Sequence, residues 1–173
     1  MNCLSIAQVP PIIVPPDATV LDAIDASLST RVGAVAVVES GALVGIFTER
    51  DVMLKVVHER RDPATTPVGA VMTSPVITIL PVASDEYVLR LMTERHIRHL
   101  PISEDGKTVL GILSIRNVLE YLLEERNRDL KHLTAYVGAD YPRSQAAEKR
   151  MDGGWWGLGP HAPSREHGSL HPI

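Results

Sequence analysis

Two short motifs carry side chains that could hold a ligand by hydrogen bonds. The motifs read GIFTERD and GILSIRN. In the first, the hydroxyl of Thr48 stands three residues before the carboxylate of Asp51, which at a helix start is a suitable acceptor for the two hydroxyls of a sugar diol. The second motif places Ser114 three residues before Asn117. Both spacings also fit capping boxes, whose side chains only satisfy N–H groups at a helix start.

Both motifs belong to an internal repeat. Residues 17–48 align with residues 82–114 at a shift of 65 positions, which becomes 66 after one inserted residue near Lys107. A repeat of this length should be identified before any other fold assignment. We place the first repeat at 8–62 and the second at 68–125, with a polar, proline-containing stretch as the connector.

Each repeat predicts the same order of elements, β-α-β-β-α, and therefore an α/β (α+β) fold. The first copy predicts strands at 12–14, 32–38 and 43–47, with helices that begin after Thr19 and Thr48. The second predicts strands at 76–80, 99–102 and 109–113, helices after Ser84 and Ser114, and a helix extension over 126–138. Residues 139–173 show no periodicity, and we predict a disordered tail there.

The duplicated pattern resembles a tandem cystathionine-β-synthase (CBS) domain pair, or Bateman module. The resemblance rests on GIFTERD at 45–51, GILSIRN at 111–117 and RHIRHLPISEDG at 95–106, and it covers roughly residues 8–125. It implies two repeats packed about a pseudo-twofold axis, with clefts between them that bind AMP, ADP, ATP or another adenosyl ligand. The Thr or Ser and the Asp or Asn of each motif would then bind the ribose. Those residues are Thr48, Asp51, Ser114 and Asn117.

Asymmetry between the copies affects the expected ligand contacts. Asn117 is neutral and offers one carbonyl acceptor, so the second site is expected to be weak, altered or empty. Arg98 and His99 match positions where the family often carries phosphate-binding side chains, whereas the first repeat has Gly33 and Ala34 there. We expect His99 to add a positive charge near neutral pH. Further candidates for phosphate contacts are Arg50 and Arg116, while Arg95 and His96 are interpreted as a surface cluster.

Composition excludes several classes of function. The net charge of −4 argues against bulk binding to nucleic acid, and the longest apolar stretches are well short of the ~20 residues of a membrane-spanning helix. Cys3 is the only cysteine, which excludes an intrachain disulfide and fits a reducing cytoplasm. We find no phosphate-binding loop with Lys, no GxSxG and no HExxH, so we expect neither a catalytic centre, a metal site nor an obligatory cofactor.

Two functions remain open from the sequence. The first is a regulatory module that binds an adenine nucleotide and acts in trans on an unknown protein partner or through self-association. The second is a structural or interaction protein that keeps the fold but has lost the ligand. We also expect a homodimer, because the last helix carries a stripe of apolar residues that Arg126 and Asn127 interrupt, although the stripe could instead pack on its own domain. The stripe contains Leu119, Leu122, Leu123, Leu130 and Leu133.

Overall fold

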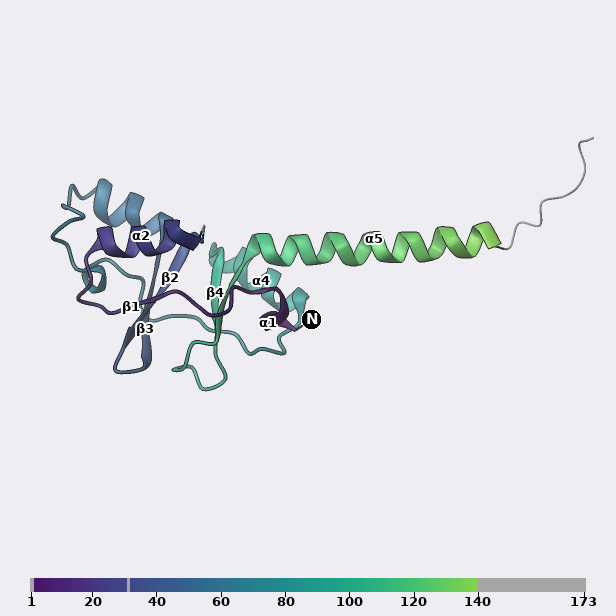
Figure 1. Ribbon diagram of the computed structural model, residues 1–173, viewed down its shortest axis with the longest axis horizontal. Coiled ribbons are helices and arrows are strands. Elements are labelled where there is room, and N and C mark those ends of the chain that lie inside the picture. The colour runs from purple at the N-terminus through teal and green to yellow at the C-terminus, as the bar shows by residue number, and fades with distance from the viewer. Residues whose placement is uncertain (1, 31, 140–173) are drawn as a thin grey trace, which may run out of the picture. The chain divides into compact units, whose positions relative to one another are not determined.

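The computed structural model describes residues 2–30 and 32–139, so the tail expected beyond residue 139 lies outside the described residues (Figure 1). The first half contains α1 (Cys3–Ile6), β1 (Ile13–Val14), α2 (Val20–Thr30), β2 (Ala34–Glu39), β3 (Ala42–Thr48), α3 (Glu49–Asp51) and the π-helical segment η1 (Val52–Val57). The second half contains the 3₁₀ turn η2 (Val68–Ala70), α4 (Asp85–Arg95), β4 (His99–Ile102), β5 (Gly111–Ser114) and α5 (Ile115–Ala139).

The helix starts follow the polar residues that the sequence indicates. Asp22 accepts hydrogen bonds from the backbone N–H and the hydroxyl of Thr19, at 3.0 and 2.6 Å, and donates its own N–H to that hydroxyl. Ser84 accepts the N–H of Tyr87 at the start of α4. These caps satisfy N–H groups that have no partner inside the helix. The helices α2 and α4 therefore begin where the sequence repeat predicts.

The two sheets differ although they come from the same repeat. In the first, β1 pairs with β2 in parallel and β2 pairs with β3 in antiparallel orientation. In the second, β4 pairs with β5, but the strand expected at 76–80 is reduced to a single bridge from Ile79 to Ile102. A longer parallel ladder would need N–H donors from Pro81 and Pro101, and proline has none. Proline therefore limits this pairing on both sides of Ile79.

Each repeat completes the strand arrangement of the other. Gln8 lies before the first repeat's strands and exchanges backbone hydrogen bonds of 3.0 and 3.2 Å with Ile112 in β5. Thr73 lies before the second repeat's strands and exchanges bonds of 2.8 and 3.0 Å with Ile46 in β3. Gln8 and Thr73 are 65 positions apart, and Ile46 and Ile112 are 66 apart, as in the sequence repeat. The reciprocal pairing confirms the expected pseudo-twofold arrangement.

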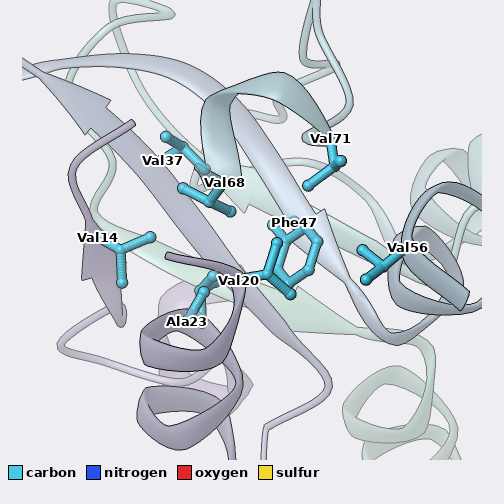
Figure 2. Packing of buried hydrophobic residues seen from close by; sticks show 9 residues of the cluster. Val14, Val20, Ala23, Val37, Phe47, Val56, Val68 and Val71 are labelled. Carbon is cyan, nitrogen blue, oxygen red and sulfur yellow. The ribbon is translucent and has the colours of Figure 1, made fainter. Parts of the chain in front are cut away.

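The core consists of three apolar clusters, one in each repeat and one between them. In the first repeat, the ring of Phe47 lies among the side chains of α2, η1 and η2, with Val20, Val56 and Val71 around it (Figure 2). The second repeat has its own cluster around Leu100 and Leu113. A third cluster joins both repeats; its buried members are Ala34, Ala36, Ile46 and Ile112. Burial of both faces of the central strands agrees with their unbroken apolar sequence.

The helix α1 was not expected from the sequence. Its four residues are too few to show a helical period, yet Cys3 is fully buried in the second repeat's cluster and its N–H donates to the carbonyl of Pro81 at 2.9 Å. Leu4 and Ile6 pack on the same cluster. The segment ahead of the first repeat therefore supplies part of the core of the second.

Candidate functional site

A cleft between the repeats contains five of the residues singled out from the sequence. This first cleft has a volume of about 280 Å³ and combines the β3–α3 motif with the end of α4 and the start of β4. Those five residues are Thr48, Arg50, Asp51, Arg98 and His99. Lys55, Thr73 and Arg95 also line it.

A second cleft lies at the pseudo-symmetric position. It has a volume of about 360 Å³ and contains the three other predicted residues, Ser114, Arg116 and Asn117. His99 lines this cleft too, so it borders both clefts. From the first repeat come Thr30 and Gly33, and from the N-terminal segment comes Gln8.

Asp51 is the most heavily bonded residue of the first cleft. It is only 5% exposed, and its Oδ2 accepts the N–H and the hydroxyl of Thr48 at 2.9 and 2.7 Å. Its Oδ1 accepts the hydroxyl of Thr73 at 2.8 Å and forms an ion pair with Nζ of Lys55 at 2.8 Å. A carboxylate has about four acceptor positions. All of them are used by protein groups, so a ribose hydroxyl can bond to Asp51 only by replacing one of these donors.

Lys55 was missed in the sequence analysis. Its ammonium contacts Asp51 and also donates to the carbonyl of Met72 at 2.9 Å and to the hydroxyl of Thr73 at 3.1 Å. The available signal was the i, i+4 spacing from Asp51, which places both side chains on one face of a helix. Lys55 therefore ties the motif of the first repeat to the segment that leads into the second.

The second motif is bonded in a similar way but is neutral. The Oδ1 of Asn117 accepts the N–H of Ser114 at 3.1 Å and its hydroxyl at 2.5 Å, and Asn117 donates its N–H to that hydroxyl at 3.2 Å. Tyr121 stands at the position equivalent to Lys55 and bonds to Glu125. Among the described residues that line the second cleft, therefore, none carries an ammonium group.

His99 lies against the glycine where the two clefts meet. A Cβ atom on residue 33 would be 3.2 Å from Cε1 of His99 and 3.2 Å from Cδ of Glu49, so glycine leaves room for both side chains. Burial of the imidazole and the charge of Arg98 hold the pKa of His99 below its ordinary value, Glu49 opposes this, and Arg116 adds to it. These surroundings favour the neutral imidazole in the ligand-free protein, and a positive charge on His99 beside a bound phosphate stays a prediction.

The arginines of the clefts have different surroundings. Nη1 of Arg50 donates to the carbonyl of His96 at 3.2 Å, where α4 ends in a left-handed residue, and so joins the two repeats. Arg98 and Arg116 are exposed, and neither takes part in an ion pair with any residue of the described ranges. Their guanidinium groups therefore suit an anionic ligand better than that of Arg50.

No group of three or more His, Cys, Asp or Glu side chains in residues 2–30 and 32–139 is arranged to hold a metal ion. In the same ranges, no helix has the length and apolar character needed to cross a membrane.

Comparisons with known proteins agree with the fold and the repeat. The family model for the CBS domain matches twice, over residues 5–58 and 68–124. The mitochondrial CBS domain-containing protein CBSX3 of Arabidopsis thaliana is 37% identical over 130 residues, which are 72% of this chain and 63% of that protein. This chain therefore spans less than two thirds of that relative.

Two solved structures have similar folds. A hexameric CBS-CP12 protein from bloom-forming cyanobacteria matches with a TM-score of 0.63 and 27% identity, over 81% of this chain and 90% of that chain. A CBS domain protein from Pyrobaculum aerophilum, complexed with AMP, matches with a TM-score of 0.60 and 26% identity, over 68% of this chain and 89% of that chain.

Proposed function

Because the chain belongs to the CBS domain family, we propose that it is a regulatory module that binds an adenine nucleotide or a related adenosyl ligand in the clefts between its repeats. The observation that carries this proposal is the composition of the first cleft. One cavity brings the Thr48–Asp51 pair together with cationic side chains, which are Arg50, Lys55, Arg95 and Arg98. A ribose phosphate requires hydrogen-bond acceptors for its ribose hydroxyls and cationic side chains for its phosphate.

The AMP complex of the Pyrobaculum protein supports this ligand class, because the two folds are similar. In the proposal, Arg98 binds phosphate in the first cleft and Arg116 in the second, while Thr48, Asp51, Ser114 and Asn117 bind ribose. His99 donates or accepts a hydrogen bond at the border of the two clefts. No catalytic step forms part of the proposal, and the nucleotide acts as a regulatory ligand.

A second candidate is an interaction protein that has lost its ligand. The observation in its favour is that the carboxylate of Asp51 is fully used by Thr48, Lys55 and Thr73. The neutral Asn117 in the second motif points the same way. Under this alternative both motifs are structural caps, and the clefts bind no nucleotide.

Thermal unfolding of the full chain with AMP, ADP, ATP, S-adenosylmethionine or NADH separates the two candidates. We expect at least one adenosyl ligand to stabilise the protein, by about 2.7 kcal/mol at 100 times its dissociation constant. Inorganic phosphate and inosine monophosphate are controls for charge alone and for the purine base. Unchanged melting with all five ligands would favour the interaction protein.

The site of action is also a proposal. We propose that the module acts in trans on a partner protein or through self-association, in the cytoplasm. Microscopy of the tagged chain in cells tests the compartment. A mitochondrial location, which the name of the Arabidopsis relative gives for that protein, is the outcome that would contradict the cytoplasm.

For self-association, we propose a homodimer through the second helical segment of each repeat. Met53 and Val57 in η1 are 66% and 67% exposed, and the equivalent residues of α5, Leu119 and Leu123, are 48% and 64% exposed. Leu122, by contrast, packs on the second repeat's own core. Exposed apolar side chains at symmetry-related positions form two matching patches, which a second copy can cover with the same two patches of its own.

Light scattering at roughly micromolar concentration tests the dimer. The wild-type chain should show twice the monomer mass, and the double variant L119E/L123E should show the monomer mass, because a buried charge without a partner opposes association. Val82→Glu is the matched control, since Val82 is 81% exposed in a turn outside both patches. A monomeric wild type, or a dimeric double variant, contradicts the proposed interface.

A further inference from the structure

The N-terminal segment places in the second cleft one polar side chain whose buried oxygen has no hydrogen-bond partner among the described residues. Gln8 lines this cleft, and the two backbone hydrogen bonds to Ile112 fix its position. Its side-chain Oε1 is buried and has no hydrogen-bond donor among the described residues. A buried acceptor without a donor is unfavourable, and native structures usually supply a partner for it.

The repeat shows what this position does in the other cleft. Thr73 is the equivalent of Gln8, since each is paired through its backbone to the second central strand of the opposite repeat. The hydroxyl of Thr73 donates to the carboxylate of Asp51. The position therefore lies beside the ribose-binding motif in the first cleft.

In the second cleft the motif cannot satisfy Gln8 in the same way. The Oδ1 of Asn117 is an acceptor already bonded to the N–H and the hydroxyl of Ser114. The hydroxyl of Ser114 is used as a donor in that bond, so it offers no proton to Gln8. Neither of these two groups can donate to Oε1 of Gln8, whereas a hydroxyl of a molecule bound in the cleft can.

We propose that Gln8 is a ligand-binding residue of the second cleft, and that its Oε1 accepts a hydrogen bond from a ribose hydroxyl. The proposal rests on the proposed function, and it extends the site to the start of the first repeat. The ribose end of the second cleft then consists of two neutral amides, Gln8 and Asn117. The first cleft has a carboxylate and an ammonium at that end instead.

The charge of the two clefts gives the ligand class. Arg116 is the one Lys or Arg among the described residues that line the second cleft, whereas four such residues line the first. With one cation among its described residues and neutral ribose contacts, the second cleft suits a nucleoside or a nucleoside monophosphate. The first cleft has four cations against the two carboxylates of Glu49 and Asp51, and this excess of positive charge suits a ligand with more phosphates.

Calorimetric titration of the full chain with AMP and with adenosine, fitted to two sites, tests the proposal. Gln8→Leu should weaken one of the two sites about three- to tenfold, the effect of one neutral hydrogen bond. Gln8→Glu, which keeps an acceptor oxygen, should retain more affinity than Gln8→Leu. Thr73→Val is the matched variant in the first cleft, and it should change the other site.

The ribose assignment has its own readout. The 2′-deoxy and 3′-deoxy forms of AMP lack one hydroxyl each, and one of them should bind the second site more weakly in the wild type but not in Gln8→Leu. Melting temperatures of each variant show whether it is folded. If the wild type binds AMP at two sites and Gln8→Leu changes neither, the Gln8 proposal is wrong and the proposed function stands. If the wild type binds no adenosyl ligand, the proposed function itself fails.

Discussion

Replacing Asp51 by alanine is expected to lower the free energy of unfolding by about 2–4 kcal/mol. The buried carboxylate accepts hydrogen bonds from both Thr48 and Thr73, and it balances the ammonium of Lys55. Hydrogen bonds to charged groups contribute about 1.5–3 kcal/mol each, and loss of one member of a buried ion pair leaves the other uncompensated. The estimate stays below the sum of these effects because the Lys55 side chain is 34% exposed and can turn to water.

Urea denaturation of the wild type and the variant gives this difference. Asn117→Ala is the matched control, because Asn117 holds the equivalent position with the same cap and no ion pair. Its loss should be about 1 kcal/mol, the typical effect of a helix cap. Equal losses in the two variants would show that Lys55 and Thr73 add nothing to the stability of the first motif.

The Asp51→Ala variant also tests the ribose contact, when nucleotide binding is measured at a temperature where the variant is folded. A ribose bond to Asp51 predicts a loss of nucleotide affinity of roughly ten- to a hundredfold, corresponding to one hydrogen bond to a charged group. Lower stability with unchanged affinity would assign Asp51 to capping and inter-repeat bonding alone.

Arg98→Ala should weaken binding of AMP, ADP and ATP about ten- to a hundredfold, and of adenosine much less. Arg98 is exposed, lines the first cleft and belongs to no ion pair of the described residues, so its planar guanidinium can bond to phosphate oxygens. A charge-assisted hydrogen bond of about 1.5–3 kcal/mol gives that range. Binding of the phosphorylated ligands should also weaken as salt rises, because salt screens the charges.

Titration of adenosine, AMP, ADP and ATP into the wild type and Arg98→Ala supplies the comparison. Arg90→Ala is the control: Arg90 is an exposed arginine within α4, and it stacks over the ring of Tyr87 at 5.9 Å from the centroid, outside both clefts. Loss of adenosine and ATP affinity by the same factor would show that Arg98 shapes the cleft and does not bind phosphate.

The repeat in the sequence was sufficient to predict the fold and to identify residues that the structure brings into the clefts. Thr48 and Asp51 could be paired from their spacing, and the match of Arg98 with Gly33 revealed the charge asymmetry. These predictions succeeded because duplication fixes equivalent positions in three dimensions. The lowered pKa of His99 in the ligand-free protein could not be predicted, because it depends on burial and on charges contributed by both repeats.

Features that depend on long-range contacts were also missed. The residue types around Ile79 favour a strand, but the length of its pairing depends on Pro101 in the neighbouring strand. Gln8 has no distinguishing local pattern, and Lys55 has only its i, i+4 spacing from Asp51. The importance of both residues follows from partners in the other repeat. Local propensity describes a segment alone, whereas tertiary contacts decide which groups face a cleft.

The burial of α1 in the second repeat has a consequence for synthesis of the chain. Cys3 and Gln8 leave the ribosome before their partners in the second core and in β5, which follow roughly a hundred residues later. The first repeat can form most of its own core early, because Phe47 and Val71 are synthesised before β5. The apolar side chains of α1 therefore stay unburied until β5 has left the ribosome. Closure of the second core is therefore a late, long-range step, and it joins the earliest-made part of the described chain to one of the latest.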